Sequence, residues 1–114
     1  MADDTSPVGK SVEASLRLDF YGNLLSERSR RLMELHFDED LSYAEIAEQL
    51  GISRQAVHDG VSRALAQLEE YEARLGLIGR FGTQRRLVEE ALRLIGEGRE
   101  EDASRKLRSL LEQL

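Results

Sequence analysis

The 114 residues include 16 Lys or Arg, 22 Asp or Glu and no Cys, which gives a net charge of −6. Without Cys, disulfides and thiolate metal sites are excluded, and no apolar run approaches the roughly 18 residues that a membrane span needs. This length and composition predict an all-α fold with little room for a deep catalytic cleft. Because the start of the sequence is acidic and polar, unlike a secretory signal, we expect a cytoplasmic protein.

The first part of the chain is predicted to form two helices after a flexible tail. Residues 1–12 show no periodicity and are the expected tail. From Leu16 onward apolar residues recur at helical spacing. Ser26 is the expected N-cap of a second helix, which carries Leu32 and ends at the acidic run 38–40, because Asp favours helix ends.

A helix-turn-helix is predicted between Ser42 and Leu68. Ser42 and Glu45 have the spacing of a capping box, in which the two side chains satisfy free N–H groups of the first helical turn. Gly51 follows this helix, at a position where a left-handed residue ends a helix without steric cost, and Ser53 caps the next one. The small and apolar residues that fix the crossing of the two helices are Ala47, Ile52, Val57 and Val61.

The fourth helix is expected to be long, because an apolar stripe at spacings of three and four continues to Ile78. Gly76 and Gly79 are expected to fray or end it. Gly60 lies in its middle, where it costs about 1 kcal/mol relative to Ala. Either another backbone approaches closely at this position, or the glycine is simply tolerated.

Residues 83–114 are predicted to form a helical hairpin that turns at 96–98, with Leu92 and Ile95 among its inward-facing side chains. The predicted organisation is therefore a tail at 1–12, a helix-turn-helix domain at 13–81 and a hairpin for interaction or dimerisation at 82–114.

The second helix of such a motif normally enters the major groove of DNA, with its early residues nearest the bases. Arg54 has the donors to read guanine, and Gln55 can pair with adenine. Asp59 would repel phosphate unless it pairs with a cytosine amino group or with Arg63. The candidate nucleic-acid-binding residues on this helix are Ser53, Arg54, Gln55, His58, Asp59, Ser62 and Arg63.

The charge is distributed unevenly along the chain. Residues 16–31 carry +2 and residues 32–52 carry −6, so a polyanion would have to meet the basic part while the acidic part points elsewhere. Arg28, Arg30 and Arg31, with Arg17, either grip phosphates or form a solvated face that pairs with nearby Glu. Residues 38–40 either mimic phosphate toward a basic partner or form a polar loop.

The apolar stripe of the fourth helix predicts a homodimer seam; the alternative is that the C-terminal hairpin covers the same stripe within one chain. The residues of the predicted dimer interface are Val61, Leu65, Leu68, Tyr71, Leu75 and Ile78.

No enzymatic constellation is found in the sequence. His36 and His58 stand far apart, and adjacent residues such as His58 and Asp59 point about 100° apart on a helix. The run 9–11 resembles the end of a phosphate-binding loop, but Asp4 stands where its first Gly is needed. We therefore expect no catalytic residues, metal, cofactor or small-molecule substrate.

Several segments together resemble the YlxM family, whose members are small bacterial proteins similar to region 4 of sigma factors and are typically encoded beside the GTPase of the signal recognition particle and its receptor. The resemblance spans about residues 16–81. Its segments are 19–21, 24–26, 36–42, 69–72 with Leu75, and, most specifically, Ser53-Arg54-Gln55-Ala56-Val57-His58-Asp59.

The resemblance implies a sigma region 4-like helix-turn-helix protein that regulates the signal recognition particle pathway by binding the particle's RNA or its GTPase. The chain departs from the family in being less basic in its second and fourth helices, which weakens the case for nucleic-acid contact. Its hairpin is also richer in Leu, Arg and Glu, which favours a protein contact. The alternatives are a DNA-binding transcription regulator and a dimeric interaction module that has lost nucleic-acid contact.

Overall fold

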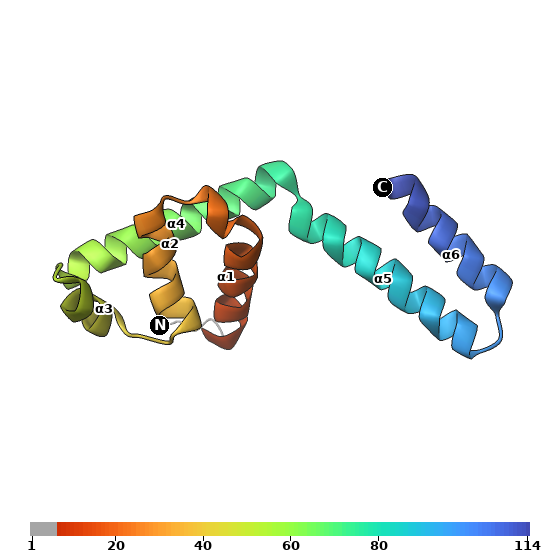
Figure 1. Cartoon of the computed structure of the whole chain (residues 1–114), viewed down its shortest axis with the longest axis horizontal. Helices are drawn as coiled ribbons and strands as arrows, with labels where there is room; N and C mark the ends of the chain where they lie inside the picture. The colour runs from red at the N-terminus through yellow and green to blue at the C-terminus, as the bar shows by residue number, and fades with distance from the viewer. Residues whose placement is uncertain (1–6) are drawn as a thin grey trace. The chain divides into compact units, whose positions relative to one another are not determined.

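The computed structural model describes residues 7–114, and side chains from Val12 onward, and no strand occurs among these residues. The predicted all-α class is confirmed. The elements are α1 (Pro7–Tyr21), the 3-10 turn η1 (Gly22–Leu24), α2 (Glu27–Met33), the π-helical turn η2 (Glu34–Asp38), α3 (Tyr43–Leu50), α4 (Arg54–Leu75), α5 (Leu77–Gly96) and α6 (Glu100–Gln113) (Figure 1). Two compact units meet in the chain between Leu75 and Gly76.

The tail predicted at residues 1–12 is only partly described. Residues 1–6 lie outside the described residues, whereas α1 already begins at Pro7. A proline fits the first turn of a helix, because the N–H that it lacks has no partner there. Residues 7–12 are therefore helical, which corrects the expected boundary.

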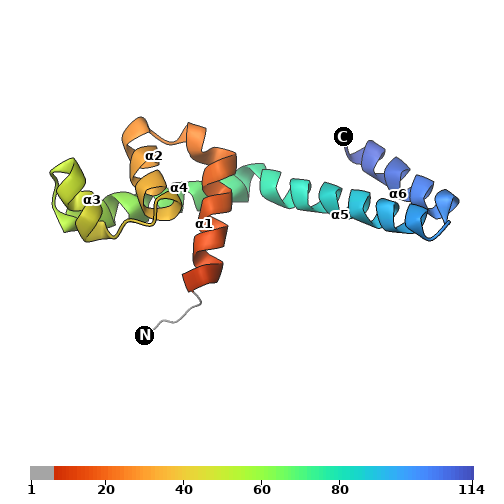
Figure 2. The ribbon, with the colours of Figure 1, turned by 60° about the horizontal axis from the view of Figure 1, so that its bottom comes forward.

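In the first unit α1, α2 and α3 all pack against α4 (Figures 1 and 2). The side of α4 that faces them carries buried residues at spacings of three and four, as an amphipathic helix requires. Each large apolar side chain that is fully buried stabilises the fold by about 1.5–3 kcal/mol. The large side chains with almost no exposed surface are Tyr21, Met33, Leu35, Ile46, Val57, Val61 and Leu68.

Gly60 lies where Leu32 of α2 packs directly against α4. A Cβ atom at this position would lie 2.5 Å from Cδ1 of Leu32, far inside van der Waals contact. Gly60 itself is buried and Leu32 is only 3% exposed. The glycine is therefore explained by close approach, although its neighbour is a side chain rather than the expected backbone.

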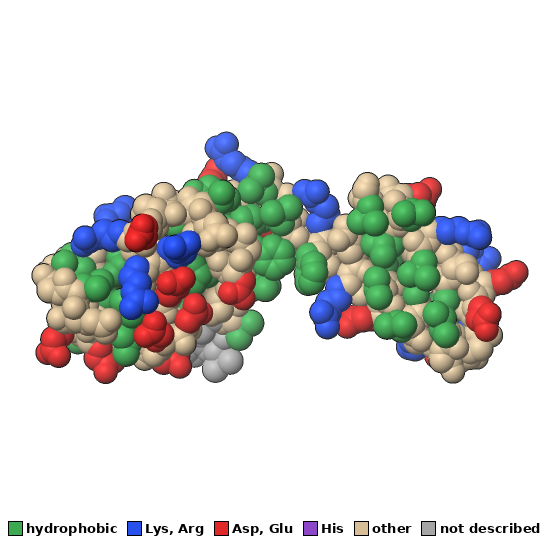
Figure 3. Space-filling model, in the orientation of Figure 1, with side chains coloured by type: hydrophobic (Ala, Val, Ile, Leu, Met, Phe, Trp, Pro, Cys, Tyr) green, Lys and Arg blue, Asp and Glu red, His purple; other side chains and the backbone are tan. Residues whose placement is uncertain are grey.

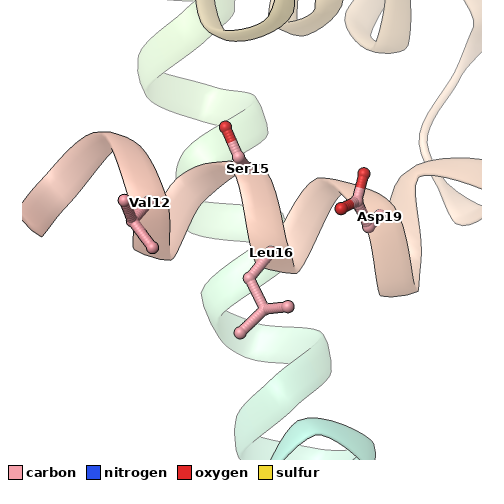
Figure 4. Close-up of a pocket in the computed structure, with 4 residues that line it drawn as sticks. All are labelled: Val12, Ser15, Leu16 and Asp19. Atoms are coloured by element: carbon pink, nitrogen blue, oxygen red, sulfur yellow. The ribbon is translucent and has the colours of Figure 1, made fainter.

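Tyrosines attach α1 to the C-terminal half of α4. The hydroxyl of Tyr21 donates to the carboxylate of Glu72, and the rings of Tyr21 and Tyr71 lie 6.1 Å apart. The Tyr71 hydroxyl donates to the Leu24 carbonyl over 3.3 Å. On another side of α1, Val12, Ser15, Leu16 and Asp19 line an open hollow of about 360 Å³ (Figure 4).

The second unit is the predicted helical hairpin, which begins earlier than expected. Gly76, with φ of +62°, ends α4, and the helix resumes at once at Leu77, so that Gly79 lies inside α5. Gly98, with φ of +78°, lies in the turn to α6. Across the hairpin, Nζ of Lys106 lies 3.1 Å from a carboxylate oxygen of Glu90.

The core of the hairpin is small. Its buried cluster consists of Ala91, Leu94 and Ala103. Leu92 and Ile95 were expected to face inward, but their side chains are 63% and 49% exposed. The side of α5 that carries Ala91 and Leu94 faces α6 instead. Figure 3 shows apolar side chains gathered on one face of this unit. The exposed apolar residues of α5 and α6 include Val88, Leu92, Ile95, Leu107, Leu111 and, at the chain end, Leu114.

No helix among the described residues is long and apolar enough to cross a bilayer.

Candidate nucleic-acid interface

The predicted turn between α3 and α4 is confirmed in its hydrogen bonds. The backbone N–H of Glu45 donates to Oγ of Ser42 over 3.1 Å, and the Ser42 N–H donates to Oε1 of Glu45 over 2.8 Å. Gly51 has φ of +68° and ψ of +36° and donates to the Ala47 carbonyl, as does Ile52 over 3.1 Å. The helix-turn-helix is therefore built by local sequence, since a capping box and a left-handed glycine define both ends of α3.

The start of α4 turns its candidate contact residues outward. Oγ of Ser53 accepts from the Ala56 N–H over 3.0 Å and so caps the helix. Val57 and Val61 are fully buried, which fixes the rotation of α4 about its axis. Consequently Ser53, Arg54, Gln55, His58, Ser62 and Arg63 are exposed and Asp59 is partly exposed. The first turn of α4 contains no acidic residue, so the positive end of its dipole remains open to an anion.

Asp59 interacts along its own helix. Nε2 of Gln55 donates to Oδ1 of Asp59 over 2.9 Å, and Nδ1 of His58 lies 3.6 Å from the same oxygen. The expectation that His58 and Asp59 point apart is thus corrected. Their Cβ atoms diverge on the helix, but the ends of the two side chains approach each other. No ion pair links Asp59 to Arg63 among the described residues. Gln55 keeps its carbonyl oxygen available as an acceptor.

A pocket of about 260 Å³ lies between α2 and α4 beside Gly60. Arg28 and Ser29 contribute to it from α2, and Arg63 contributes from α4. Neither arginine forms an ion pair with any residue that the structure describes. Two guanidinium groups and a hydroxyl in one pocket can bind the oxygens of a phosphate, although the carboxylate of Asp59 lines the same pocket and repels an anion.

The other predicted basic residues are already engaged. Arg30 donates to Asn23 over 2.9 Å and lies 3.9 Å from Glu34, and Arg31 lies 3.4 Å from Glu39. Exposed pairs of this kind contribute about 0–1 kcal/mol, so a phosphate can displace them but must compete for the cation. Arg17 is likewise paired with Glu13 over 3.0 Å.

Comparison with known proteins identifies the family. Residues 8–107 match the model of family UPF0122, described as "Putative helix-turn-helix protein, YlxM / p13 like". UPF0122 proteins of Bacillus cereus (strain AH187), Bacillus anthracis (strain A0248) and Bacillus thuringiensis subsp. konkukian (strain 97-27) are each 40% identical to the chain over 103 residues. Each alignment covers 90% of this chain and 92% of the relative.

The chain belongs to the UPF0122 family. The resemblance to YlxM proteins inferred from the sequence is therefore confirmed. The match extends beyond residue 81 into the hairpin, so both units of this UPF0122 protein lie within the family pattern.

Tyr43, which lies between the capping-box residues Ser42 and Glu45, was not among the candidate site residues predicted from the sequence. Tyr43 lines a second pocket, of about 320 Å³, together with Arg54, Gln55 and His58. The sequence carried only a weak signal, a large aromatic residue at the first position of α3, because the contact of this residue with α4 follows only from the fold. In this UPF0122 chain the start of α4 therefore has an aromatic neighbour.

The predicted dimer seam is distributed between core and surface. Val61 and Leu68 have no exposed surface and belong to the core of the first unit, so they would meet a second copy only if that unit opened. Leu65 and Tyr71 are half-buried, and Leu75 is 44% exposed. Ile78 belongs to the second unit and is half-buried.

Acidic side chains gather on one edge of the first unit, although Asp59 lies within the candidate interface itself. Figure 3 shows them gathered along the lower edge of that unit, with basic side chains above them. Partial burial, and then repulsion by Asp19, Glu34 and Glu39, raise the pKa of Asp38 above its usual value. Asp40, which lies just after η2, has φ of +58°, which non-glycine residues rarely adopt.

Proposed function

We propose that this UPF0122 protein is a regulatory protein that acts by binding nucleic acid through the start of α4, and that it has no enzymatic activity. The observation that carries the proposal is that three arginines, Arg28, Arg54 and Arg63, form no ion pair with any described residue. Arg54 lines the pocket beside Tyr43, whereas Arg28 and Arg63 line the pocket beside Gly60. They stand beside an exposed recognition helix of a helix-turn-helix family. Cations without partners release the most counterions from a polyanion when they bind it.

The target that we propose is the RNA of the signal recognition particle, in the cytoplasm. The support for this choice is the YlxM likeness, since YlxM proteins are associated with that pathway. The particle's GTPase is the alternative partner within the same pathway. The acidic edge and the apolar hairpin face are the surfaces that support a protein contact.

The acidic net charge limits how strongly the protein binds a backbone. Three phosphate contacts on a duplex give a slope of log affinity against log salt of about −2.7, which is about a 40-fold loss between 50 and 200 mM salt. Removing Arg28 and Arg63 leaves one contact and a slope of about −1.

The test measures binding of the particle RNA and of a random DNA duplex by fluorescence anisotropy at several salt concentrations. We expect Arg28→Ala/Arg63→Ala to weaken RNA binding and to flatten the salt dependence. The control is Arg86→Ala, which removes a hairpin arginine that also lacks an ion pair with described residues. A double variant with an unchanged salt slope would contradict the proposed interface. GTPase binding without salt dependence, and no binding of either nucleic acid, would favour the interaction module.

A DNA-binding transcription regulator is the second candidate. Arg54 and Gln55 support it, because both are exposed at the first turn of α4 and can form bidentate bonds to guanine and adenine. In that case Arg54→Ala abolishes sequence preference among DNA duplexes in a selection assay. A wild-type protein without any such preference would remove this candidate.

We further propose that two copies associate through the exposed apolar face of the hairpin. Eight basic and seven acidic residues from 76 to 114 nearly balance, so two hairpins meet without net repulsion, whereas residues 1–75 carry eight basic and fifteen acidic residues. We expect Leu92→Glu to yield monomers in sedimentation velocity. The control Gln113→Glu adds the same charge at a polar, exposed position of α6 and should leave the dimer intact. A wild-type chain that is monomeric at micromolar concentration would refute the dimer.

A further inference from the structure

The pocket at the junction of α3 and α4 has the composition of a base-binding site. Tyr43 and His58 contribute rings to it, while Arg54 and Gln55 contribute polar groups. We propose that this pocket binds one unpaired nucleobase of a folded RNA, with the base stacked on the ring of Tyr43. The inference rests on the proposed function, and it names the part of the nucleic acid that the recognition helix contacts.

Tyr43 is held as a fixed platform. Its ring centroid lies 4.7 Å from that of His36, and Nδ1 of His36 lies 2.8 Å from the Leu41 carbonyl oxygen, which anchors the imidazole. The rings of His58 and Tyr43 are arranged edge-on, with 5.8 Å between their centroids and 78° between their planes. At this spacing no third ring fits between Tyr43 and His58, so a base enters the pocket that both rings line and meets Tyr43 there. A platform that is ordered beforehand loses little entropy when a base stacks on it.

Arg54 and Gln55 supply complementary groups for the edge of the base. Arg54 offers only donors, and it has no ion pair with any described residue. The amide nitrogen of Gln55 is held by Asp59 over 2.9 Å, so its carbonyl oxygen is the atom left to accept a hydrogen bond. The pocket can therefore recognise a base edge that carries both an acceptor and a donor.

The size of the pocket suits a single base. Its volume of about 320 Å³ lies near the lower end of the roughly 300–1,000 Å³ that small-molecule sites occupy. A base inside a duplex exposes only its edges, because its flat faces are covered by its neighbours, and an aromatic platform then has nothing to stack on. Unpaired bases in loops and bulges are the groups that proteins stack on aromatic side chains.

The candidate interface supplies few arginines without an ion pair to a described residue, which points the same way. Three arginines give only a weak hold on a backbone. Stacking on an aromatic side chain is a contribution that does not depend on phosphates, which an acidic protein needs if it is to bind RNA.

The experiment compares an RNA hairpin carrying a single bulged 2-aminopurine with the same hairpin fully paired, and with the DNA versions of both. We expect the bulged RNA to bind about tenfold or more tightly than the paired one, and its fluorescence to be quenched on binding. Tyr43→Ala should abolish the preference and the quenching, whereas Tyr43→Phe keeps the ring and should retain both. Circular dichroism verifies that each variant is folded.

Arg54→Ala provides a second variant that leaves the exposed helix surface otherwise intact. We expect it to reduce discrimination among the four bases placed at the bulge, while Arg28→Ala weakens bulged and paired RNA equally. Equal affinity of the wild-type protein for bulged and paired RNA would overturn the base pocket but leave the proposed function standing. Absence of binding to either RNA and either DNA at low salt would overturn both. An equal preference for bulged DNA would support the pocket and show that it does not read the sugar.

Discussion

Replacing Gly60 by Ala tests how tightly α2 and α4 are packed. In an exposed helix interior the substitution Gly→Ala stabilises by about 1 kcal/mol, because alanine has less backbone freedom to lose. At position 60, however, the new Cβ lies 2.5 Å from Cδ1 of buried Leu32. Overpacking of this kind typically costs about 1–3 kcal/mol. The two effects together predict a net loss of about 1 kcal/mol, since the overpacking cost exceeds the gain in propensity.

Thermal unfolding provides the assay. A loss of 1 kcal/mol lowers the Tm of a unit of this size by about 4–8 °C. All three tyrosines, at positions 21, 43 and 71, belong to the first unit and the chain has no Trp, so tyrosine fluorescence follows that unit alone. Circular dichroism follows both units together.

Two further variants separate packing from propensity. Gly82 lies inside α5 with nothing within 4 Å of a Cβ, so Gly82→Ala should stabilise the hairpin by about 0.5–1 kcal/mol. In a Leu32→Val background, which lacks the colliding methyl group, Gly60→Ala should change sign and become stabilising. If Gly60→Ala stabilises the otherwise native chain as Gly82→Ala does, the close crossing at Gly60 is not a constraint and the reasoning fails.

Three other substitutions have definite expected outcomes. Ser53→Ala removes the cap of α4 and should cost about 1 kcal/mol in urea unfolding, whereas Ser53→Asp should keep most of that stability. The hydrogen bonds from Ser42 hold the pKa of Glu45 below its usual value. Their stabilisation is therefore present above the pKa of Glu45 in the unfolded chain, and it is lost as the pH falls through the pKa in the folded chain. Glu45→Gln should remove this acid dependence from the Tm measured against pH. The raised pKa of Asp38 means that its charge opposes folding at neutral pH, so Asp38→Asn should raise the Tm at pH 7, and this gain should disappear once the pH falls below the unfolded pKa. An equal effect of Asp38→Asn at pH 3 and pH 7 would contradict that account.

Local signals made the helix-turn-helix predictable. The Ser42 and Glu45 capping box, the left-handed Gly51 and the Ser53 cap each act within a few residues, and the structure contains all of them. Position along the apolar stripe also predicted which residues of α4 are outward-facing. These features depend on hydrogen bonds and on an apolar periodicity within a single helix and its caps, so nearby residues in the sequence are sufficient to predict them.

Features that depend on contact between distant segments were not predictable. Gly60 is explained only when Leu32 of another helix is placed against it. The sequence pattern likewise could not decide which apolar side of α5 faces α6, and Leu92 was assigned inward although it is exposed. Tyr43 became a site residue because folding brings it beside His58. In each case periodicity gives the spacing of apolar or aromatic residues but not the identity of the element that meets them.

The small core of the hairpin has a thermodynamic consequence. Two helices that bury little more than Ala91, Leu94 and Ala103 between them gain little free energy to offset the entropy of ordering. Anything that covers the exposed apolar face binds the ordered hairpin only, and at 100 times its Kd it adds about 2.7 kcal/mol to the stability. Slow amide exchange in α5 and α6 is therefore a reporter of occupancy, and it should become faster on dilution as the covering molecule leaves.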